Sequence, residues 1–279
     1  MPRKKLVGEE AWKNIGGMYE LKDLIEHKIL LPLQNRELAE KHGVIIPKTI
    51  LLFGPPGTGK TIFARAIAKR LGWSLIGISS IDIRSGCYGE RAKGVQQLME
   101  DLRRKSKTVI FFDELEELVR RRTKEASDVD RQVTNEFLRQ LPELRKTEDI
   151  LVVCATNYVE QMDPAALRPG RFDYIMPVDL PDFDARKEVF RIRLKNMVVG
   201  DMNLEALAKE TEGFTPADIV EVCNRVAQMG FEKEYFQKEE YAATTEDFIK
   251  VIRQHEPTVS EEGLAKFKEA KKEFGRAIY

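Results

Sequence analysis

Residues 50–61 read Ile-Leu-Leu-Phe-Gly-Pro-Pro-Gly-Thr-Gly-Lys-Thr, and this stretch decides the fold. The apolar run at its start predicts a buried strand, and the spacing of Ile62, Ala64 and Ile67 after it predicts a helix. A glycine-rich loop between a strand and a helix is the context of a phosphate-binding loop. Its glycines let backbone N–H groups converge on an oxyanion, and the helix adds its positive dipole end. The alternative is a glycine-rich turn that matches by chance, and the flanking strand and helix argue against it.

This loop supplies candidate ligands for a nucleotide and its metal ion. Lys60 is expected to reach the β- and γ-phosphates of ATP, and the Thr61 hydroxyl is expected to bind Mg²⁺. The residues expected to contact the nucleotide here are Gly54, Pro55, Pro56, Gly57, Thr58, Gly59, Lys60, Thr61 and Ile62. A phosphate loop by itself indicates only nucleotide binding, so the reaction must be inferred from the rest of the chain.

Length and composition narrow the class of protein. A chain of 279 residues is long enough for two domains. Its 46 basic and 46 acidic residues cancel, so no overall field points to nucleic acid or an anionic membrane, and neither partner is expected. Three widely spaced cysteines form neither a disulfide nor a metal-binding pattern, which indicates a reducing compartment. No apolar run has membrane-spanning length and no secretory signal is visible, so the expected location is the cytoplasm.

Apolar runs that alternate with helical patterns predict an α/β fold in the first part of the chain. Continuous apolar strands of this kind predict a parallel sheet covered by helices on both faces, which is the P-loop NTPase architecture. The expected strands cover residues 50–53, 74–78, 108–112, 150–155 and 174–178.

After residue 184 only helices are expected. The clearest of them begins at Thr215-Pro216-Ala217-Asp218, which combines a capping box with proline at the first helical position. We therefore expect a smaller, all-helical lid domain to follow the sheet. The predicted organisation is a flexible tail at 1–10, an α/β ATPase domain at 11–180 and the lid domain at 181–279.

Two prolines are expected to end helices. Pro32 follows a helical pattern that includes Leu21 and Ile29, and Pro142 follows one that includes Phe137. Because proline lacks the N–H that an inner helical turn requires, each helix is expected to stop there.

Paired carboxylates follow the third expected strand, at Phe111-Phe112-Asp113-Glu114. Ligands bind at the carboxyl ends of parallel strands, so both acids are expected to face the phosphate loop. Asp113 would hold Mg²⁺ directly or through water, and Glu114 would polarise the attacking water. The alternative is an acidic helix start, because carboxylates are favoured at helix N-termini.

Asn157 closes the next expected strand in the same manner. Its side chain can donate to a γ-phosphate or to the attacking water. An asparagine at a strand end is more often a turn residue, so its assignment depends on a wider pattern.

That wider pattern resembles the AAA ATPase family proper, part of the AAA+ superfamily, over about residues 11–275. The pattern is most similar to the valosin-containing and Cdc-type unfoldase cassettes and to the proteasomal ATPases. Six motifs occur in the family's order and spacing, namely Trp12–Gly17, the phosphate loop, Phe111–Glu114, Ala155–Asn157, Met162–Asp173 and Gly213–Asp218.

The resemblance implies a homo-oligomeric ring, a hexamer in this family, with ATP at the subunit interfaces. Arg168 and Arg171 match the family's arginine fingers, which reach into the neighbouring subunit's site. A guanidinium there stabilises the charge that develops on the transferred phosphate. Without the resemblance, the same residues would be interpreted as a solvated surface turn.

The resemblance also implies a pocket for the adenine base. Asn14, Ile15 and Gly16 match one wall of that pocket, and Pro216 and Ala217 match the part contributed by the lid. Pro216 stands where the family usually has glycine, so a slightly altered adenine contact is expected. Arg193 stands where the family often has a histidine that contacts the nucleotide; it either contacts ribose or phosphate or is solvated.

The resemblance is weakest in the loop that is expected to grip a substrate. The family places a basic residue, an aromatic and an aliphatic residue before Gly-Glu, whereas this chain has Gly86-Cys87-Tyr88 before Gly89-Glu90. Cys87 and Tyr88 are the candidate pore loop. In the alternative, Tyr88 packs on the sheet and the ring does not thread polypeptide.

The function expected from these residues is Mg²⁺-dependent ATP hydrolysis in a ring that remodels or unfolds a protein. Two alternatives stay open. One is a nucleotide-gated factor that assembles or disassembles a partner complex without threading it, and the other is a nucleic-acid motor. Only about ten residues precede the first motif, so either the chain is a fragment or an adaptor or the ring itself selects the substrate.

Overall fold

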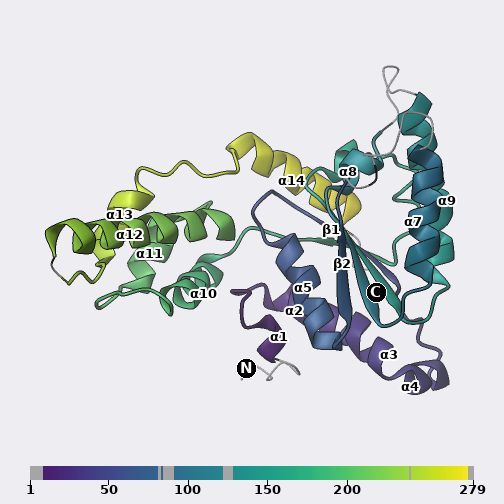
Figure 1. Ribbon diagram of the computed structural model, residues 1–279, viewed down its shortest axis with the longest axis horizontal. Helices are drawn as coiled ribbons and strands as arrows, with labels where there is room; N and C mark the ends of the chain where they lie inside the picture. The colour runs from purple at the N-terminus through teal and green to yellow at the C-terminus, as the bar shows by residue number, and fades with distance from the viewer. Residues whose placement is uncertain (1–8, 81–82, 84–90, 122–127, 239, 276–279) are drawn as a thin grey trace.

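The computed structural model describes residues 9–80, 83, 91–121, 128–238 and 240–275. Five strands form one parallel sheet in the order β2–β3–β4–β1–β5 (Figure 1). Strands β1, β3 and β4 are buried along their whole length, which requires cover on both faces. The strands are β1 (Thr49–Phe53), β2 (Ser74–Ile78), β3 (Thr108–Phe112), β4 (Ile150–Thr156) and β5 (Tyr174–Pro177). The expected α/β parallel sheet is confirmed.

Alternate residues of β1 enter two different cores, as the period of two in a strand requires. Ile50 and Leu52 pack with Phe63 of helix α5, whereas Leu51 and Phe53 pack with side chains on the opposite face. The helices on the first face are α1 (Glu9–Trp12), α2 (Tyr19–Ile25), η1 (Glu26–Leu30), α3 (Leu31–Gln34) and α5 (Lys60–Leu71). Those on the second face are α7 (Arg91–Arg103), α8 (Leu115–Leu118) and α9 (Asp128–Arg145). The short elements α4 (Arg36–Lys41) and η2 (Val159–Gln161) complete this part.

Both helices that were expected to end at a proline continue past it. Pro142 lies inside α9, between Leu141 and Leu144, which are both fully buried. The packing of these two leucines outweighs the loss of one backbone hydrogen bond. Pro32 lies in the first turn of α3, where a helix does not need its N–H, and the π-helical turn η1 precedes it. The expectation of a stop at Pro32 and at Pro142 is therefore wrong.

The helical part of the chain has a core of its own. It comprises α10 (Phe183–Leu194), α11 (Leu204–Glu210), α12 (Pro216–Gln237) and α13 (Thr245–Ile252). Phe190, Ile219 and Phe248 are fully buried within that core. The Thr215–Asp218 capping box predicted at the start of α12 is present, and Thr244 and Asp247 form a second one at α13.

The last helix, α14 (Glu261–Phe274), returns to the α/β part (Figure 1). Ala270 is buried in the same core as α7 and α9, with Phe267 and Phe274 packed against it. Lys271 Nζ also lies 2.7 Å from Asp179 Oδ2, close to the end of β5. None of the helices in the described part of the chain has the length and apolar character needed to cross a bilayer.

Candidate active site

The glycine-rich loop lies at the carboxyl end of β1 and leads into α5. Gly57 and Gly59 have φ angles of 79° and 95°, which glycine adopts at little cost and other residues rarely adopt. The loop therefore closes tightly ahead of Lys60, the first residue of α5. The unpaired N–H groups at the start of α5 make this end of the sheet suited to an anion.

Lys60 is folded over its own loop. Its side chain is 7% exposed, and Nζ donates to the carbonyl oxygens of Gly54 at 2.7 Å and Pro55 at 2.9 Å. Burial lowers the pKa of Lys60 to about 8, and the negative charges of Glu116 and Asp113 oppose this shift. An ammonium that donates to neutral carbonyls at the mouth of an anion site is placed to exchange them for phosphate oxygens.

Thr61 and Asp113 bring two oxygen ligands together beside the loop. The Thr61 hydroxyl donates to Asp113 Oδ2 at 3.2 Å, and Asp113 follows directly after β3. Mg²⁺ prefers such oxygen atoms and is bound through one or two carboxylates together with phosphate, so these residues fit the ion. The described residues contain no cluster of three or more His, Cys, Asp or Glu side chains that could hold a metal, and this type of site does not need one.

Glu114 is exposed and has a φ of 50°, an uncommon value for a residue with a side chain. Its own backbone N–H donates to Asp113 Oδ1 at 3.0 Å, which holds the two acids in one turn. Strain of this kind persists where the surrounding structure imposes it, and it occurs often at active sites.

Asn157 follows β4, the neighbour of both β1 and β3 in the sheet. Its backbone N–H donates to Glu116 Oε1 at 3.0 Å. Because the three parallel strands end at one edge of the sheet, Asn157 and Asp113 lie on the side of the glycine-rich loop. The structure thus brings Lys60, Thr61 and the two strand-end residues to one place.

A cavity of about 660 Å³ continues from the loop toward α10. Of the predicted adenine pocket, Asn14, Ile15, Gly16 and Pro216 line this cavity, and the phosphate-loop segment contributes Thr58, Gly59 and Ile62. Val189, Ile192 and Arg193 of α10 form the opposite wall. Arg193 thus lies at the cavity and also donates to Asn224 Oδ1 at 3.2 Å.

Polar contacts hold the wall of this cavity in place. The buried Lys22 donates from Nζ to the carbonyl oxygen of Ile15 at 2.6 Å. Glu188 of α10 accepts from the Gly17 N–H at 2.7 Å and from the Tyr19 hydroxyl. These contacts connect the segment before α2 to the helical part of the chain, so both parts shape one cavity.

The first turn of α12 rests on the glycine-rich loop. The Ala217 N–H donates to the Gly57 carbonyl oxygen at 3.2 Å. A Cβ atom at Gly57 would lie 2.7 Å from Thr215 Oγ1, so only glycine leaves room for this approach. Pro216 and Ala217 therefore lie where the sequence predicted a lid contribution, one at the cavity and one on the loop.

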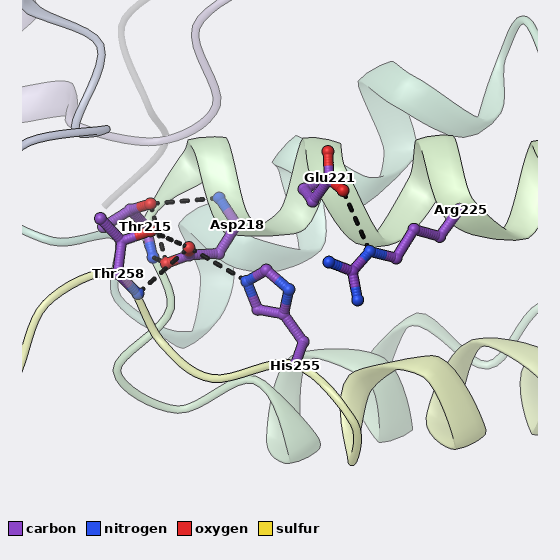
Figure 2. A network of polar contacts seen from close by, with 6 residues as sticks. All are labelled: Thr215, Asp218, Glu221, Arg225, His255 and Thr258. Carbon is purple, nitrogen blue, oxygen red and sulfur yellow. Dashed lines mark hydrogen bonds and ion pairs between the residues drawn. The ribbon is translucent and has the colours of Figure 1, made fainter.

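Asp218 joins this turn to the segment that leads into α14 (Figure 2). It is 2% exposed and accepts from the N–H and hydroxyl of both Thr215 and Thr258, while His255 Nε2 lies 3.2 Å from Oδ1. Burial alone would raise the pKa of Asp218, but the hydrogen bonds from Thr258, Thr215 and His255 hold it below its ordinary value. His255, to which the sequence assigned no role, is thus a partner of the capping carboxylate.

Arg171 lies at the opposite edge of the sheet. The Thr49 hydroxyl, at the start of β1, donates to the carbonyl oxygen of Arg171 at 2.8 Å. At about 3.3 Å per residue, the five residues of β1 separate this point from the glycine-rich loop by about 16 Å. An arginine side chain is much shorter than that. Arg171 therefore does not join the site of its own chain.

The arginine segment itself is fixed at several points. Arg145 of α9 donates to the carbonyl oxygen of Gly170 and to Asp173, and Arg171 donates to the carbonyl oxygen of Ala165. Partial burial lowers the pKa of Arg171, and the nearby positive charge of Arg168 adds to this effect, while Asp163 opposes it. The segment is thus held rigidly with its cationic side chains close together.

Three family models match the chain. They are described as the ATPase family associated with various cellular activities (AAA), over residues 50–180, the AAA+ lid domain, over 201–235, and the Vps4 C terminal oligomerisation domain, over 234–275. The chain is a member of the AAA ATPase family. The glycine-rich loop, Asp113, Glu114 and Asn157 all lie in the ATPase part of this AAA protein, and α12 starts in its lid.

Curated relatives of this AAA ATPase include two kinds of protein. The cell division cycle protein 48 homolog of Archaeoglobus fulgidus is 33% identical over 274 residues, which cover 94% of this chain and 37% of that protein. The proteasome-activating nucleotidase of Methanopyrus kandleri is 37% identical over 87% of this chain and 55% of its own length. That of Saccharolobus solfataricus is 39% identical over 78% of this chain and 57% of its own length. The chain thus spans between about a third and just over half of these relatives.

Several residues of the site were missed by sequence reasoning. Lys22, Glu116 and Glu188 each carry a charge within or beside a helical pattern, where a solvated position is the ordinary expectation. Arg145 was missed because the helix was expected to end at Pro142, whereas α9 continues to Arg145. The candidate pore residues Cys87 and Tyr88 lie outside the described residues.

Proposed function

We propose that this AAA ATPase hydrolyses ATP with Mg²⁺ in a ring of identical chains and uses the energy to remodel or unfold a protein. The nucleotide would lie with its base in the cavity beside Ile15 and its phosphates on the glycine-rich loop. When bound, Mg²⁺ would neutralise charge on the β- and γ-phosphate oxygens, held by Thr61 and Asp113. The geometry of the loop, the cavity and the Thr61–Asp113 pair supports this assignment.

Each functional side chain then has a separate task. Lys60 binds the β- and γ-phosphates in place of its two carbonyl partners. Glu114 takes a proton from the attacking water, and its exposed position leaves it accessible to that water. Asn157 orients the water or the γ-phosphate from the neighbouring strand end.

The observation that carries the proposal of a ring is the position of Arg168 and Arg171. Arg171 lies about 16 Å from its own loop at about 3.3 Å per residue of β1, too far to act there, so we assign it, together with Arg168 in the same segment, to the site of a neighbour. A head-to-tail contact that repeats in this way forms a ring when its rotation closes and an open filament when it does not, and we propose the ring. The match of residues 234–275 to an oligomerisation domain supports the same arrangement. We propose six chains in the ring, the number expected from the family.

A protein target is supported by the relatives, one group of which is named for activating the proteasome. The neutral net charge gives no support to a nucleic-acid partner. A second function, a nucleotide-gated assembly factor that does not thread its partner, is favoured by the altered sequence Gly86-Cys87-Tyr88. The variant Tyr88→Ala separates the two: loss of unfolding of a tagged reporter protein, with ATP turnover retained, supports threading.

We also propose a division of the chain near residue 180 and a reducing, cytoplasmic location. The separate core around Phe190 and Phe248 supports the division, with α14 returning to the first part. Cys154 and Cys223 are free thiols, which persist in a reducing compartment.

Two inactive variants test the shared site by complementation. Glu114→Gln is expected to bind ATP and to hydrolyse it roughly 100-fold or more slowly, because it lacks the general base. Arg171→Ala is expected to be equally slow, because each site then lacks the arginine that the neighbouring chain supplies. In an equal mixture, about a quarter of the sites combine an intact Glu114 with an intact neighbouring arginine, and turnover should return. A mixture that stays as inactive as its components would refute action across the interface.

A further inference from the structure

Glu116 is a buried carboxylate beside the reacting groups that the proposed mechanism does not use. It is the second residue of α8, three residues after Asp113, and its side chain is 5% exposed. The positive φ of Glu114 turns the chain just before α8. Glu116 thereby reaches the end of β4, where it accepts the hydrogen bond from Asn157.

The two oxygens of this carboxylate are unequally satisfied. Oε1 accepts from the Asn157 backbone N–H at 3.0 Å. Oε2 is buried and has no hydrogen-bond partner among the residues that the structure describes. A buried acceptor without a donor costs about 1–3 kcal/mol, and more when it is charged. A carboxylate in this position therefore calls for a functional reason.

Lys60 does not supply the missing hydrogen bond. Its charge is close enough for attraction to Glu116, but Nζ donates to the carbonyl oxygens of Gly54 and Pro55. The side-chain amide of Asn157 is the donor attached to the residue that Glu116 already holds. An asparagine amide carries two N–H groups, so one can bind Oε2 while the other remains free for a phosphate oxygen or for water.

We propose that Glu116 is a positioning residue for ATP hydrolysis: Oε1 holds the Asn157 backbone N–H, and Oε2, now without a donor among the described residues, accepts from the Asn157 side-chain amide when that side chain turns toward bound ATP. The second amide N–H of Asn157 is then directed toward the γ-phosphate. This inference rests on the proposed function, since it acts through the role assigned to Asn157. It adds a third acidic residue, after Asp113 and Glu114, to the machinery.

The variant Glu116→Gln separates positioning from a structural role. Glutamine keeps one acceptor oxygen for the Asn157 N–H but places an amide donor where Oε2 lies, so that two donors face each other. Misdirecting a catalytic group in this way lowers kcat by roughly 10- to 100-fold. Glutamine carries no charge to desolvate, which offsets the lost attraction to Lys60, so the melting temperature is expected not to fall. ATP affinity, measured with a fluorescent analogue, is expected to stay within about threefold.

Glu117→Gln is the matched control, because it makes the same change one residue later in α8. Glu117 pairs with Arg120 at the surface, and this variant is expected to keep the wild-type kcat. A Glu116→Gln protein that melts at a lower temperature, or one that hydrolyses ATP at the wild-type rate, would overturn the inference.

A double-mutant cycle with Asn157→Ala distinguishes this inference from the proposed function. If Glu116 acts through Asn157, adding Glu116→Gln to Asn157→Ala lowers kcat no further. An unaltered kcat in Asn157→Ala alone would contradict the proposed function of Asn157. A slow Asn157→Ala combined with a further, independent loss from Glu116→Gln would contradict only the positioning role.

Discussion

Replacing Gly17 with alanine measures how closely α10 approaches the segment that forms the nucleotide cavity. A Cβ atom at Gly17 would lie 2.2 Å from Ala185 Cβ and 2.8 Å from Ala185 Cα. Carbon atoms pack at about 3.5–4.0 Å, so α10 must move by more than 1 Å, as judged from that limit. The shift also stretches the 2.7 Å hydrogen bond from the Gly17 N–H to Glu188.

The size of the effect follows from a matched control elsewhere in the chain. Gly43 has a φ of 67°, close to the 61° of Gly17, but a Cβ there would meet nothing within 4 Å. Gly43→Ala should therefore cost only the backbone strain, about 1–2 kcal/mol. Gly17→Ala carries the same strain and an overpacking cost of about 1–3 kcal/mol more. The difference between the two variants, about 2 kcal/mol, measures the contact with α10.

Urea unfolding followed by tryptophan fluorescence provides the assay, because Trp12 is buried next to this segment. If the nucleotide cavity closes only with α10 in place, the same free-energy cost of about 2 kcal/mol should weaken ATP binding by at most about 30-fold. Equal unfolding free energies for Gly17→Ala and Gly43→Ala, within about 0.5 kcal/mol, would refute the reasoning. Equal values would mean that α10 moves away from residue 17 without a cost in free energy.

Two further predictions concern Asp218 and Lys60. In Asp218→Asn one acceptor oxygen replaces two, so one set of donors loses its partner, and the unfolding free energy should fall by about 2 kcal/mol. Thr258→Val removes a single hydroxyl donor, so its unfolding free energy should fall by less. An equal fall in both variants would contradict this account. Because burial holds the pKa of Lys60 at about 8, the side chain loses its proton above that pH and phosphate charge would restore it. ATP binding should therefore weaken as the pH rises above about 8 and take up a proton there, but not at about pH 6. Calorimetry in buffers of different ionisation enthalpy measures this uptake, and equal uptake at both pH values would contradict it.

The sheet and the phosphate end of the site were predictable because local signals and the global fold agree there. The apolar run 50–53 favours a buried strand, the glycines after it favour a turn, and the structure has both. Parallel strands then place Asp113 and Asn157 at the same edge by geometry alone. The expected helix end at Pro142 was wrong because the packing of buried neighbours outweighed a local preference. The one at Pro32 was wrong because Pro32 lies in a first helical turn, where its missing N–H is not needed.

The sequence by itself determined the chemistry of the phosphate loop, the order of the elements and the residues at the strand ends, since each depends on neighbours in the chain. Only the tertiary structure decided which charged residues are buried. Glu116 and Lys22 look solvated in sequence, yet each holds a backbone group of the site. It also decided that α14 returns to the α/β part and that Arg171 lies beyond the reach of its own loop. The reason is physical: burial and distance arise from contacts between segments far apart in the chain, which no local pattern records.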